Sequence, residues 1–556
     1  MGLQLRQWQE EKLDEALNVI KNGKTLVLSA NPGAGKTIFA LLLAKMLNKK
    51  AVFFVRTHSE FESVYKNTKM LDMSVGFLFG KSSSCVYAEG NEDPEDINCD
   101  LCSLKEKIKV IEDKEPTKIL SEIKHAEDYC PYYSMKSSLR DKEVIVLTYP
   151  YLFSKHIRNS LFMKKDSLNP SDYLAIVDEA HNILEADKWF MRKITERTVE
   201  RAMEEVDVVG SLGKVEVKEV KEYLNSILKF MGQLVRDGKC HSLPIIPRSS
   251  PELLRKINLI TATYVNLNKG PVNKSSLRAL SKFLNEEGEV FNCNGLLVVI
   301  PNNYFEEMQD ALSLFKYKLL MSGTMPQISL PNLHRIDVNV SLGKAEYYYC
   351  SSVSSSMRNR SNSAGVYAEV LSKIYGLSSS NVLVFFPSYA MLSLVKEKVK
   401  GIPIIEEGKN VAHSEMIELM KGGRYLIFLV SRAKESEGIE FRDEKNKNLF
   451  DSLVLAGLPY PNISDDIINR RIGRLARSWG VSEEEVAKQF TLITVKQTIG
   501  RAFRDPNDFV RIYLCDSRYK EYFSDLGLKE KDIKLFVLNN NEAPYDYRSS
   551  SKIYRR

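Results

Sequence analysis

The sequence predicts an α/β protein built from two tandem parallel-sheet domains. Two apolar runs of strand length support this, because each leads into a helical stretch. Residues 25–30 precede "TIFALLLAKML", and residues 381–389 precede "AMLSLVKEKVK". Strands that alternate with helices are typical of parallel layers. Residues 81–141 and 187–295 differ in composition from these α/β stretches, and both segments are expected to be insertions into the first domain.

Composition restricts the class of protein. The chain has 556 residues, 44% hydrophobic and 27% charged, which indicates a folded protein of several domains rather than a disordered one. The net charge of +7 permits a nucleic-acid partner, but from charge alone an ordinary basic surface is the better explanation. The charged N-terminus does not resemble a signal peptide, and no apolar run approaches the ~20 residues that span a bilayer. We therefore expect a cytoplasmic protein without a membrane segment.

The first insertion carries four of the eight cysteines, spaced C-x13-C-x2-C-x27-C at Cys85, Cys99, Cys102 and Cys130. In a reducing compartment such a cluster is more often a metal site than a disulfide framework. The single C-x2-C knuckle favours zinc, whereas the proline after Cys130 favours an iron–sulfur ligand. From the residues alone both metals remain open. A helix is expected over "LKEKIKVIEDK", residues 104–114.

The remaining segments carry weaker signals. The second insertion has Lys, Glu and Leu at helical spacing, as in "TVERAMEEV" and "EVKEYLNSILKFM". The serine-rich residues 350–363 are expected to form an exposed loop, and residues 549–556 a frayed tail. The other cysteines are interpreted as isolated, buried, small hydrophobic residues: Cys240, Cys293, Cys350 and Cys515.

A phosphate site is predicted at "SANPGAGKT", where the first strand leads into a helix. A turn with Gly33, Ala34 and Gly35 lets backbone N–H groups and the helix N-terminus surround phosphate oxygens. Lys36 is expected to reach the β- and γ-phosphates, and Thr37 to ligate Mg²⁺. The usual pattern begins with glycine where this chain has Ala30. A chance glycine turn is the competing interpretation.

Two acids follow the apolar run in "YLAIVDEAHNIL". Asp178 is expected to hold Mg²⁺, and Glu179 to orient and deprotonate the attacking water. A solvated turn would also explain two adjacent acids, but the upstream phosphate loop makes that interpretation weaker.

A third cluster lies in "VKQTIGRAFRD". On a helix, Gln497, Arg501 and Arg504 would share one face, where two guanidinium groups suit a triphosphate. An exposed basic helix is the alternative for this segment.

Together these motifs resemble the superfamily 2 helicases. The order is Gly33 to Thr37, "DEAH" at 178–181, "SGT" at 322–324, "ESEGIEF" at 435–441 and "QTIGRAFR" at 497–504. "RQWQ" resembles the adenine-sensing Q motif, through Gln9 and Arg6, and "VRTHSEF" resembles motif Ia, through Arg56 and Thr57. The cysteines lie between motif Ia and "DEAH", and a helical insertion separates "DEAH" from "SGT". That arrangement, with "CPYY" at the fourth thiol, resembles the XPD family of iron–sulfur DNA helicases.

The resemblance implies two RecA-like domains, an iron–sulfur insertion and a mostly helical arch. The implied limits are 1–80, 142–186 and 296–340 for the first domain, 81–141 for the cluster domain, 187–295 for the arch and 341–556 for the second domain. A 4Fe–4S cluster on Cys85, Cys99, Cys102 and Cys130 is implied, together with ATP and Mg²⁺. The catalytic roles are implied for Lys36, Asp178, Glu179, Gln497, Arg501 and Arg504. Gly438 is implied to lie beside the nucleotide, and Arg56 and Thr57 are implied to contact DNA.

The implied function is an ATP-dependent DNA helicase with 5′→3′ polarity that acts on single-stranded and forked DNA in repair, such as nucleotide excision repair. A monomer of archaeal type, with repair-protein partners, is implied as well. A translocase that strips proteins from DNA, and a binding module that uses ATP only as a conformational ligand, are the competing functions; RNA is a competing substrate. Tyr149 and Tyr151 suit base stacking or core packing equally.

Overall fold

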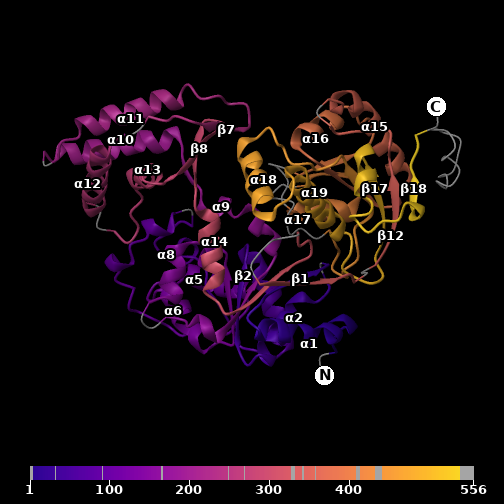
Figure 1. Cartoon of the computed structure of the whole chain (residues 1–556), viewed down its shortest axis with the longest axis horizontal. Coiled ribbons are helices and arrows are strands. Elements are labelled where there is room, and N and C mark those ends of the chain that lie inside the picture. Colours follow the sequence, from indigo (N-terminus) through magenta and orange to yellow (C-terminus); the bar gives the residue numbers. More distant parts are fainter. Residues whose placement is uncertain are drawn as a thin grey trace.

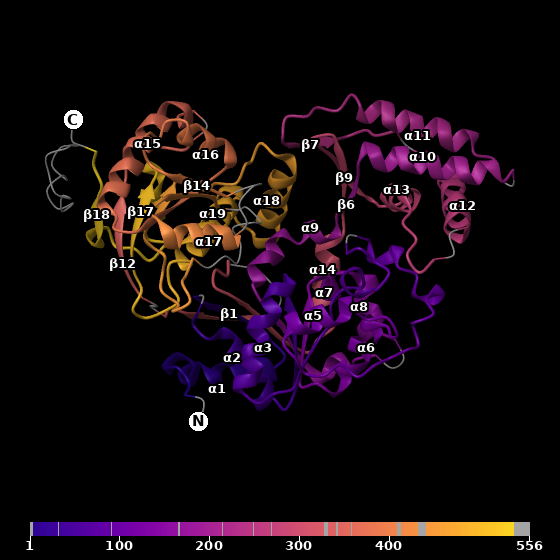
Figure 2. The same cartoon turned by 180° about the vertical axis from the view of Figure 1, so that it is seen from behind.

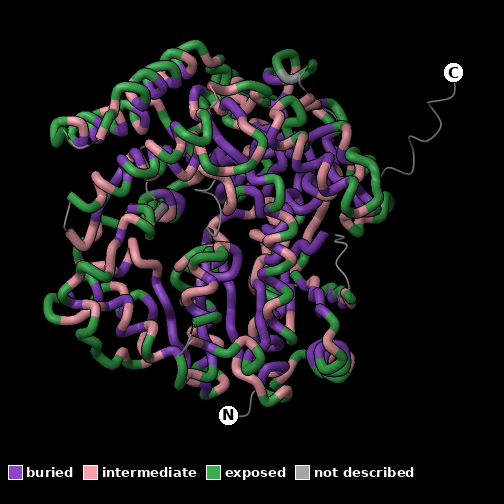
Figure 3. Tube along the Cα trace, turned by 60° about the vertical axis from the view of Figure 1, so that its left-hand side comes forward, coloured by how far each residue is buried: buried purple, intermediate pink, exposed green. Residues whose placement is uncertain are grey.

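The two predicted parallel-sheet domains lie side by side, and an elongated helical domain extends over the first (Figure 1). The computed structural model describes residues 4–31, 33–90, 92–164, 167–213, 215–247, 249–267, 270–326, 332–340, 343–356, 358–407, 413–431 and 441–538. Buried residues run along the strands inside the molecule, and exposed residues lie on outer helical turns and loops (Figure 3). Among the described residues, no helix combines the length and apolarity needed to cross a bilayer.

The first domain is a seven-stranded sheet with the order β11-β1-β10-β5-β2-β4-β3, and every pair in it is parallel. Its strands are β1 (Thr25–Ala30), β2 (Lys50–Val55), β3 (Val75–Phe77), β4 (Val144–Thr148), β5 (Tyr173–Val177), β10 (Tyr317–Ser322) and β11 (Leu333–Val338). Its helices are α1 (Gln7–Lys21), α2 (Lys36–Met46), α3 (Phe61–Met70), α7 (Pro150–Phe153), α8 (Lys155–Phe162), α9 (Asp187–Phe190) and α14 (Tyr304–Ser313). Near-continuous apolar runs such as β5, buried at every position, are what a sheet covered on both faces requires.

The cysteine-bearing segment has little regular secondary structure. It contains α4 (Lys81–Ser84), η2 (Pro94–Asp96), η3 (Cys99–Leu101), α5 (Pro116–Lys124) and α6 (Pro131–Ser138). The helix expected over residues 104–114 is wrong, because that stretch is a turn followed by irregular backbone. Its backbone is used elsewhere: Lys107 O accepts from Cys130 N at 2.8 Å, and Lys109 N donates to Ser134 Oγ at 2.9 Å. These tertiary bonds replace the local i→i−4 bonds of a helix.

The arch contains a small sheet in addition to the expected helices. The helices are α10 (Glu196–Ser211), α11 (Lys218–Met231), α12 (Pro251–Leu267) and α13 (Ser276–Leu284). The antiparallel sheet has the order β6-β9-β8-β7, from β6 (Arg192–Ile194), β7 (Cys240–Leu243), β8 (Gly288–Cys293) and β9 (Leu296–Pro301). Apolar residues at helical spacing, such as Val199, Val206 and Leu224, form a hydrophobic core within the arch.

Cys240 and Cys293 are not isolated, so that prediction is wrong. They face each other across β7 and β8 with 4.1 Å between their Cα atoms, and they form a disulfide. They are 53 residues apart in sequence, so only the pairing of the two strands brings them together. Disulfides also occur inside cells of hyperthermophiles, so the bond does not by itself indicate export.

A short junction ties the arch to the cysteine-bearing segment. Asn98 N donates to Pro271 O, and Asn273 N donates to Asp96 O, each at 2.8 Å. Beside this bridge, Arg278 NH1 lies 2.7 Å from Asp96 Oδ1, and Lys274 pairs with the almost fully buried Glu92 at 2.9 Å. The two insertions therefore form a continuous structure over the first sheet.

The second domain repeats the parallel architecture with the order β14-β15-β13-β16-β17-β12-β18. Its strands are β12 (Lys344–Tyr349), β13 (Asn381–Phe386), β14 (Ile404–Glu406), β15 (Leu426–Val430), β16 (Phe450–Ala456), β17 (Phe509–Cys515) and β18 (Ile533–Leu535). Its helices are α15 (Arg360–Leu377), α16 (Tyr389–Lys396), α17 (His413–Gly422), α18 (Asp466–Trp479) and α19 (Glu483–Gly500). The two tandem α/β domains predicted from the sequence are confirmed.

Two expectations for this domain need correction. The serine-rich segment is not a simple exposed loop, since Val353 is buried and α15 begins at Arg360. Cys350 and Cys515 are buried as expected, but they are not isolated. Cys350 N donates to Leu514 O, and this places the two sulfur atoms 2.8 Å apart.

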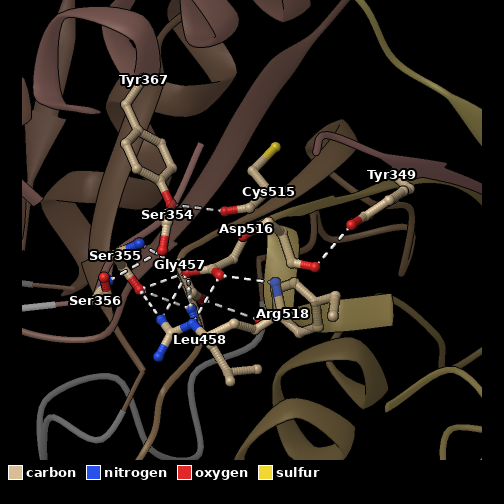
Figure 4. Close-up of polar contacts among 12 residues, drawn as sticks. Tyr349, Ser354, Ser355, Ser356, Tyr367, Gly457, Leu458, Cys515, Asp516 and Arg518 are labelled. Carbon is tan, nitrogen blue, oxygen red and sulfur yellow. Dashed lines mark hydrogen bonds and ion pairs between the residues drawn. The ribbon is translucent and has the colours of Figure 1, made fainter. Parts of the chain in front are cut away.

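The fully buried carboxylate of Asp516 fixes the serine-rich segment to the end of β17 (Figure 4). Asp516 Oδ2 accepts from the amide and hydroxyl of Ser355, each at 2.8 Å, and from Leu458 N at 3.3 Å. Arg518 pairs with the same carboxylate at 2.8 Å. Burial alone would raise the pKa of Asp516, but the hydrogen bond from Arg518 holds that pKa below its usual value.

Asp516→Ala is expected to destabilise the second domain by about 2–4 kcal/mol, because it leaves the guanidinium of Arg518 and the amides of Ser355 and Arg518 without this acceptor. Since the pKa of Asp516 is lowered in the folded chain, this stabilisation is present above about pH 4 and disappears as pH falls through the lowered pKa. Calorimetric melting at neutral pH measures the loss. Asp525→Ala, which removes a partly exposed pair with Lys488, is the control and should change stability by about 1 kcal/mol or less. An equal effect of both variants would contradict the assignment.

Candidate active site

Four predicted motifs meet at the carboxyl edge of the first sheet. β1 leads into the glycine turn, β10 ends at Ser322, β5 is followed by Asp178, and β2 is followed by Arg56. These strands are neighbours in the order β1-β10-β5-β2, so their ends lie next to one another. In open parallel sheets, ligands bind in the crevice at this edge.

The phosphate loop has the backbone that its glycines permit. Gly33 and Gly35 have φ values of 77° and 91°, in the left-handed region that favours glycine. Gly35 is the N-cap of α2, so the helix N-terminus opens at the loop. Lys36 is buried, and its Nζ donates to Ala30 O at 2.9 Å, across the base of the turn. Thr37, half-buried in the first turn of α2, lies beside it.

The "RQWQ" motif contacts this loop directly. Gln9 Nε2 donates to Gly35 O at 3.0 Å, and Trp8 Nε1 donates to Ala34 O, also at 3.0 Å. A Cβ at position 35 would lie only 2.8 Å from Gln9 Nε2, so a larger residue there would displace the Gln9 amide. Gln9 therefore holds the loop from behind, and Arg6 N in turn donates to Gln9 Oε1 at 2.8 Å.

The two acids differ in their surroundings. Burial and the charge of Glu179 raise the pKa of Asp178 above its usual value. Burial would raise the pKa of Glu179 too, but the hydrogen bond from His181, the charge of Lys36 and the hydrogen bond from Ser322 hold that pKa below its usual value. Ser322 Oγ lies 3.2 Å from Glu179 Oε2, and His181 Nδ1 also lies 3.2 Å from it. Glu179 has a left-handed φ of 45°, a strain of the kind found at functional sites.

Sequence reasoning missed Glu60. Its carboxylate accepts from Arg56 N at 2.7 Å, directly after β2. Burial, and then the charge of Asp178, raise the pKa of Glu60 to about 8, so this acid is mostly protonated at neutral pH. The capping-box spacing in "THSE", with Thr57 as N-cap, was the signal that could have shown it.

Tyr149 and Tyr151 are buried, so core packing is correct and base stacking is wrong. The Tyr149 hydroxyl donates to the carbonyl of Asp178 and, at 3.1 Å, to that of Glu179. Its ring packs against Trp189 at 4.9 Å between centroids. Tyr149 thus supports the backbone of the two acids.

The second domain reaches this site through Gln497. Gln497 Nε2 lies 2.7 Å from His181 Nε2, while His181 Nδ1 lies 2.8 Å from Ser322 Oγ. Because Ser322 also donates to Glu179, one chain of contacts runs from α19 through "DEAH" to "SGT". The structure thus brings Gln497 and Glu179 together.

The expected helical face of Gln497, Arg501 and Arg504 is wrong in part, because α19 ends at Gly500. Arg501 is the C-cap residue, and its guanidinium lies 5.3 Å from the centroid of the Phe385 ring. Arg504 lies beyond the helix, where its backbone N–H donates to Asp508 Oδ2 at 2.8 Å. The helix therefore ends at Gly500, four residues before Arg504. Gly438 lies outside the described residues.

The four predicted cysteine ligands line one cavity. Cys85, Cys99, Cys102 and Cys130 surround it, with Lys81, Lys105 and the rings of Tyr132 and Tyr133. All four thiols are half-buried, and burial raises the pKa of Cys85 and Cys130. Within the described residues, no three Cys, His, Asp or Glu side chains are close enough together to form a metal site as they stand. The structure therefore shows the convergence of the thiols, and not a metal centre.

The motif-Ia residues lie at the rim of the site. Arg56 is half-buried and Thr57 is exposed at the end of β2, next to the strand that carries Asp178. Thr57 Oγ1 lies 2.7 Å from Ser59 Oγ.

Comparison with known proteins gives the family. Residues 192–301 match the family described as DNA repair helicase XPD, arch domain, residues 58–191 match DEAD_2, and residues 371–526 match the helicase C-terminal domain. The ATP-dependent DNA helicase XPD of Sulfolobus acidocaldarius is 30% identical, over 95% of this chain and 98% of that protein. The chain belongs to the XPD family. The solved structure of S. tokodaii Xpd4 is 45% identical to this XPD-family chain and superposes with a TM-score of 0.80, over 96% of this chain and all of that one.

More distant relatives share part of the architecture. The ATP-dependent DNA helicase CHL1 of Kluyveromyces lactis is 26% identical, over 72% of this XPD-family chain and 58% of that longer protein. The resemblance drawn from the motifs is confirmed by these matches.

Proposed function

We propose that this chain is an ATP-dependent DNA helicase that translocates on single-stranded DNA and separates forked duplexes. The observation that carries the proposal is the contact between Gln497 and His181, 2.7 Å apart, which joins the two domains beside Glu179. A nucleotide bound at this edge would change how the domains meet, and alternating closure is how such enzymes step. Family membership supports the same activity.

Each proposed catalytic role follows from position. The loop of Gly33, Ala34 and Gly35 would surround the phosphates, with Lys36 on the β- and γ-phosphates. Thr37 and Asp178 would hold Mg²⁺, and Glu179, kept ionised by His181 and Ser322, would take the proton of the attacking water. Gln497, Arg501 and Arg504 would complete the site from the second domain, and Gln9 and Gly438 would contact the nucleotide.

The cysteine cavity fits a 4Fe–4S cluster. Four thiols converge on it, and Lys81 and Lys105 supply positive charge beside what would be an anionic cluster. The segment around it has little core of its own, since residues 104–115 form no helix or strand and Ile108 and Val110 are exposed. The cluster would supply the missing cross-links, and we assign it a structural role.

The remaining parts of the proposal concern the protein as a whole and the DNA strand that it follows, rather than the nucleotide site. Arg56 and Thr57 would contact the tracked strand, and the family resemblance supports 5′→3′ polarity and a role in DNA repair, including nucleotide excision repair. The domain limits stated above remain part of the proposal, as do a monomeric state, repair-protein partners and a cytoplasmic, archaeal setting.

Two assays test the function together. Phosphate release stimulated by single-stranded DNA measures turnover, and a fluorescent forked duplex measures strand separation. We expect both activities, with Mg²⁺ required for each. Turnover without strand separation would favour a remodelling translocase, and neither activity would favour a binding module. Stimulation by RNA alone would overturn the assignment of DNA as substrate.

Cys102→Ser is expected to abolish duplex separation while leaving most DNA-stimulated ATP hydrolysis, because the phosphate loop and acids lie on the first sheet and not in the cysteine segment. Iron content and broad absorption near 400 nm report the cluster. Cys515→Ser, at a buried thiol in the second domain, is the control and should keep both activities and the iron. Full strand separation by Cys102→Ser without bound iron would show that the cluster has no structural role.

A further inference from the structure

The segment that follows Glu179 is held by both domains. Glu179 leads into η6 (Ala180–Glu185) and then α9. On the first-domain side, Trp189 of α9 stacks on Phe153 at 4.8 Å and packs edge-on against Tyr149, whose hydroxyl supports the backbone of Glu179. Gln497 contacts the other end of η6 through His181.

A second contact with the second domain lies six residues beyond His181. Arg471 of α18 forms a bidentate pair with Asp187: Nε lies 2.9 Å from Oδ1, and NH2 lies 2.9 Å from Oδ2. Its NH1 also donates to Glu185 Oε1 at 3.2 Å. The side chains of Arg471 and Asp187 are 6% and 2% exposed. A buried, two-pronged pair of this kind fixes direction as well as distance.

An apolar cluster fills the space between the two polar contacts. Leu184 of η6 is 4% exposed and packs into the cluster formed by α18 and α19, which includes Ile472, Leu475 and Phe490. Figures 1 and 2 show these two helices side by side at the face of the second domain that points toward α9. The segment formed by η6 and the start of α9 is therefore attached to the same helical pair at His181, Leu184 and Asp187.

We infer that Arg471 is a positioning residue for ATP hydrolysis. By anchoring Asp187 and Glu185 to α18, it sets the position of η6 against α19, so that Gln497 meets His181 and His181 in turn meets Glu179. This inference rests on the proposed function. A buried ion pair is by itself weak evidence for stability, because well-packed apolar residues often replace such pairs without loss. The test must therefore separate positioning from folding.

The primary test is Arg471→Lys, which keeps the charge but loses the two-pronged geometry. We expect kcat of DNA-stimulated ATP hydrolysis to fall about 10-fold, and about 10²-fold in Arg471→Met, because small misplacements of reacting groups have effects of that size. The KM for ATP and the affinity for a fluorescent mant-ATP should stay within about twofold, because the phosphate loop is untouched. Arg474→Met is the matched control on the same helix, since its side chain donates to Asn302 O instead, and its kcat should be unchanged.

A paired variant covers the case in which a single change prevents folding. Arg471→Met with Asp187→Leu removes both charges, so it should fold and still show the low kcat. A folded double variant with normal kcat would show that the pair is only structural and would overturn the inference. A parallel rise in KM would overturn it too. If the wild-type chain shows no DNA-stimulated hydrolysis, the proposed function fails instead, and that result is seen before any variant is made.

Discussion

Arg501→Ala is expected to slow ATP hydrolysis by about 10³–10⁵-fold, the range found when an arginine that neutralises the transferring phosphoryl group is removed. Arg501 follows α19, which carries Gln497 into contact with His181, and closure of the two domains is expected to bring its guanidinium to the γ-phosphate. Nucleotide binding should weaken far less than turnover, because the charge it meets develops in the transition state. Single-turnover phosphate release separates the two effects.

Arg511→Ala is the matched control for this variant. Arg511 lies on β17 of the same domain and its NH1 donates to Leu377 O, away from the site. Its hydrolysis rate should stay within about twofold. Since Arg501 also stacks on Phe385, melting temperatures must accompany the rates. If folded Arg501→Ala hydrolyses ATP at a near-normal rate, Arg501 has no role in the transition state.

Lys36→Ala is expected to reduce ATP turnover by at least about 10²–10³-fold while leaving single-strand binding largely intact. Lys36 is buried at the start of α2, where its ammonium already lies against the loop that would hold the phosphates. Arg56 and Thr57, the proposed strand contacts, belong to a different strand end. DNA-stimulated phosphate release measures turnover, and fluorescence anisotropy measures strand binding.

Lys45→Ala serves as the control here, because Lys45 is exposed in the last turn of the same helix. Its turnover should match that of the wild type. DNA-stimulated hydrolysis retained by Lys36→Ala would mean that the glycine loop is not the nucleotide site.

The nucleotide motifs were visible in the sequence because each is local. "GAGKT" needs left-handed glycines directly before a helix, and "YLAIVDE" needs two acids directly after a buried strand; both patterns fit within a dozen residues. A parallel sheet then brings their ends together whatever lies between them in sequence. Glu60 was missed although its capping spacing is local, because nothing in that spacing shows that Asp178 lies nearby.

The errors share one cause. Arg504 was expected on the same helical face as Gln497, but Asp508, four residues beyond it, takes its backbone N–H after the helix has ended. Residues 104–114 have a helical pattern, yet their backbone pairs with the segment around Cys130 and Ser134. In both places a group outside the predicted helix offered the backbone a hydrogen bond that helix propensity does not take into account: a side chain four residues away at Arg504, and a segment more than twenty residues away at Lys107 and Lys109.

The sequence alone determined the two parallel sheets, the phosphate loop, the acid pair and the set of four cysteines, because spacing along the chain encodes each of them. Only the tertiary structure decided which distant residues meet: Cys240 with Cys293, Gln497 with His181, and Arg471 with Asp187. These pairs are 53, 316 and 284 residues apart. Contacts over such separations depend on how sheets and helices pack, and no local pattern of residue types specifies them.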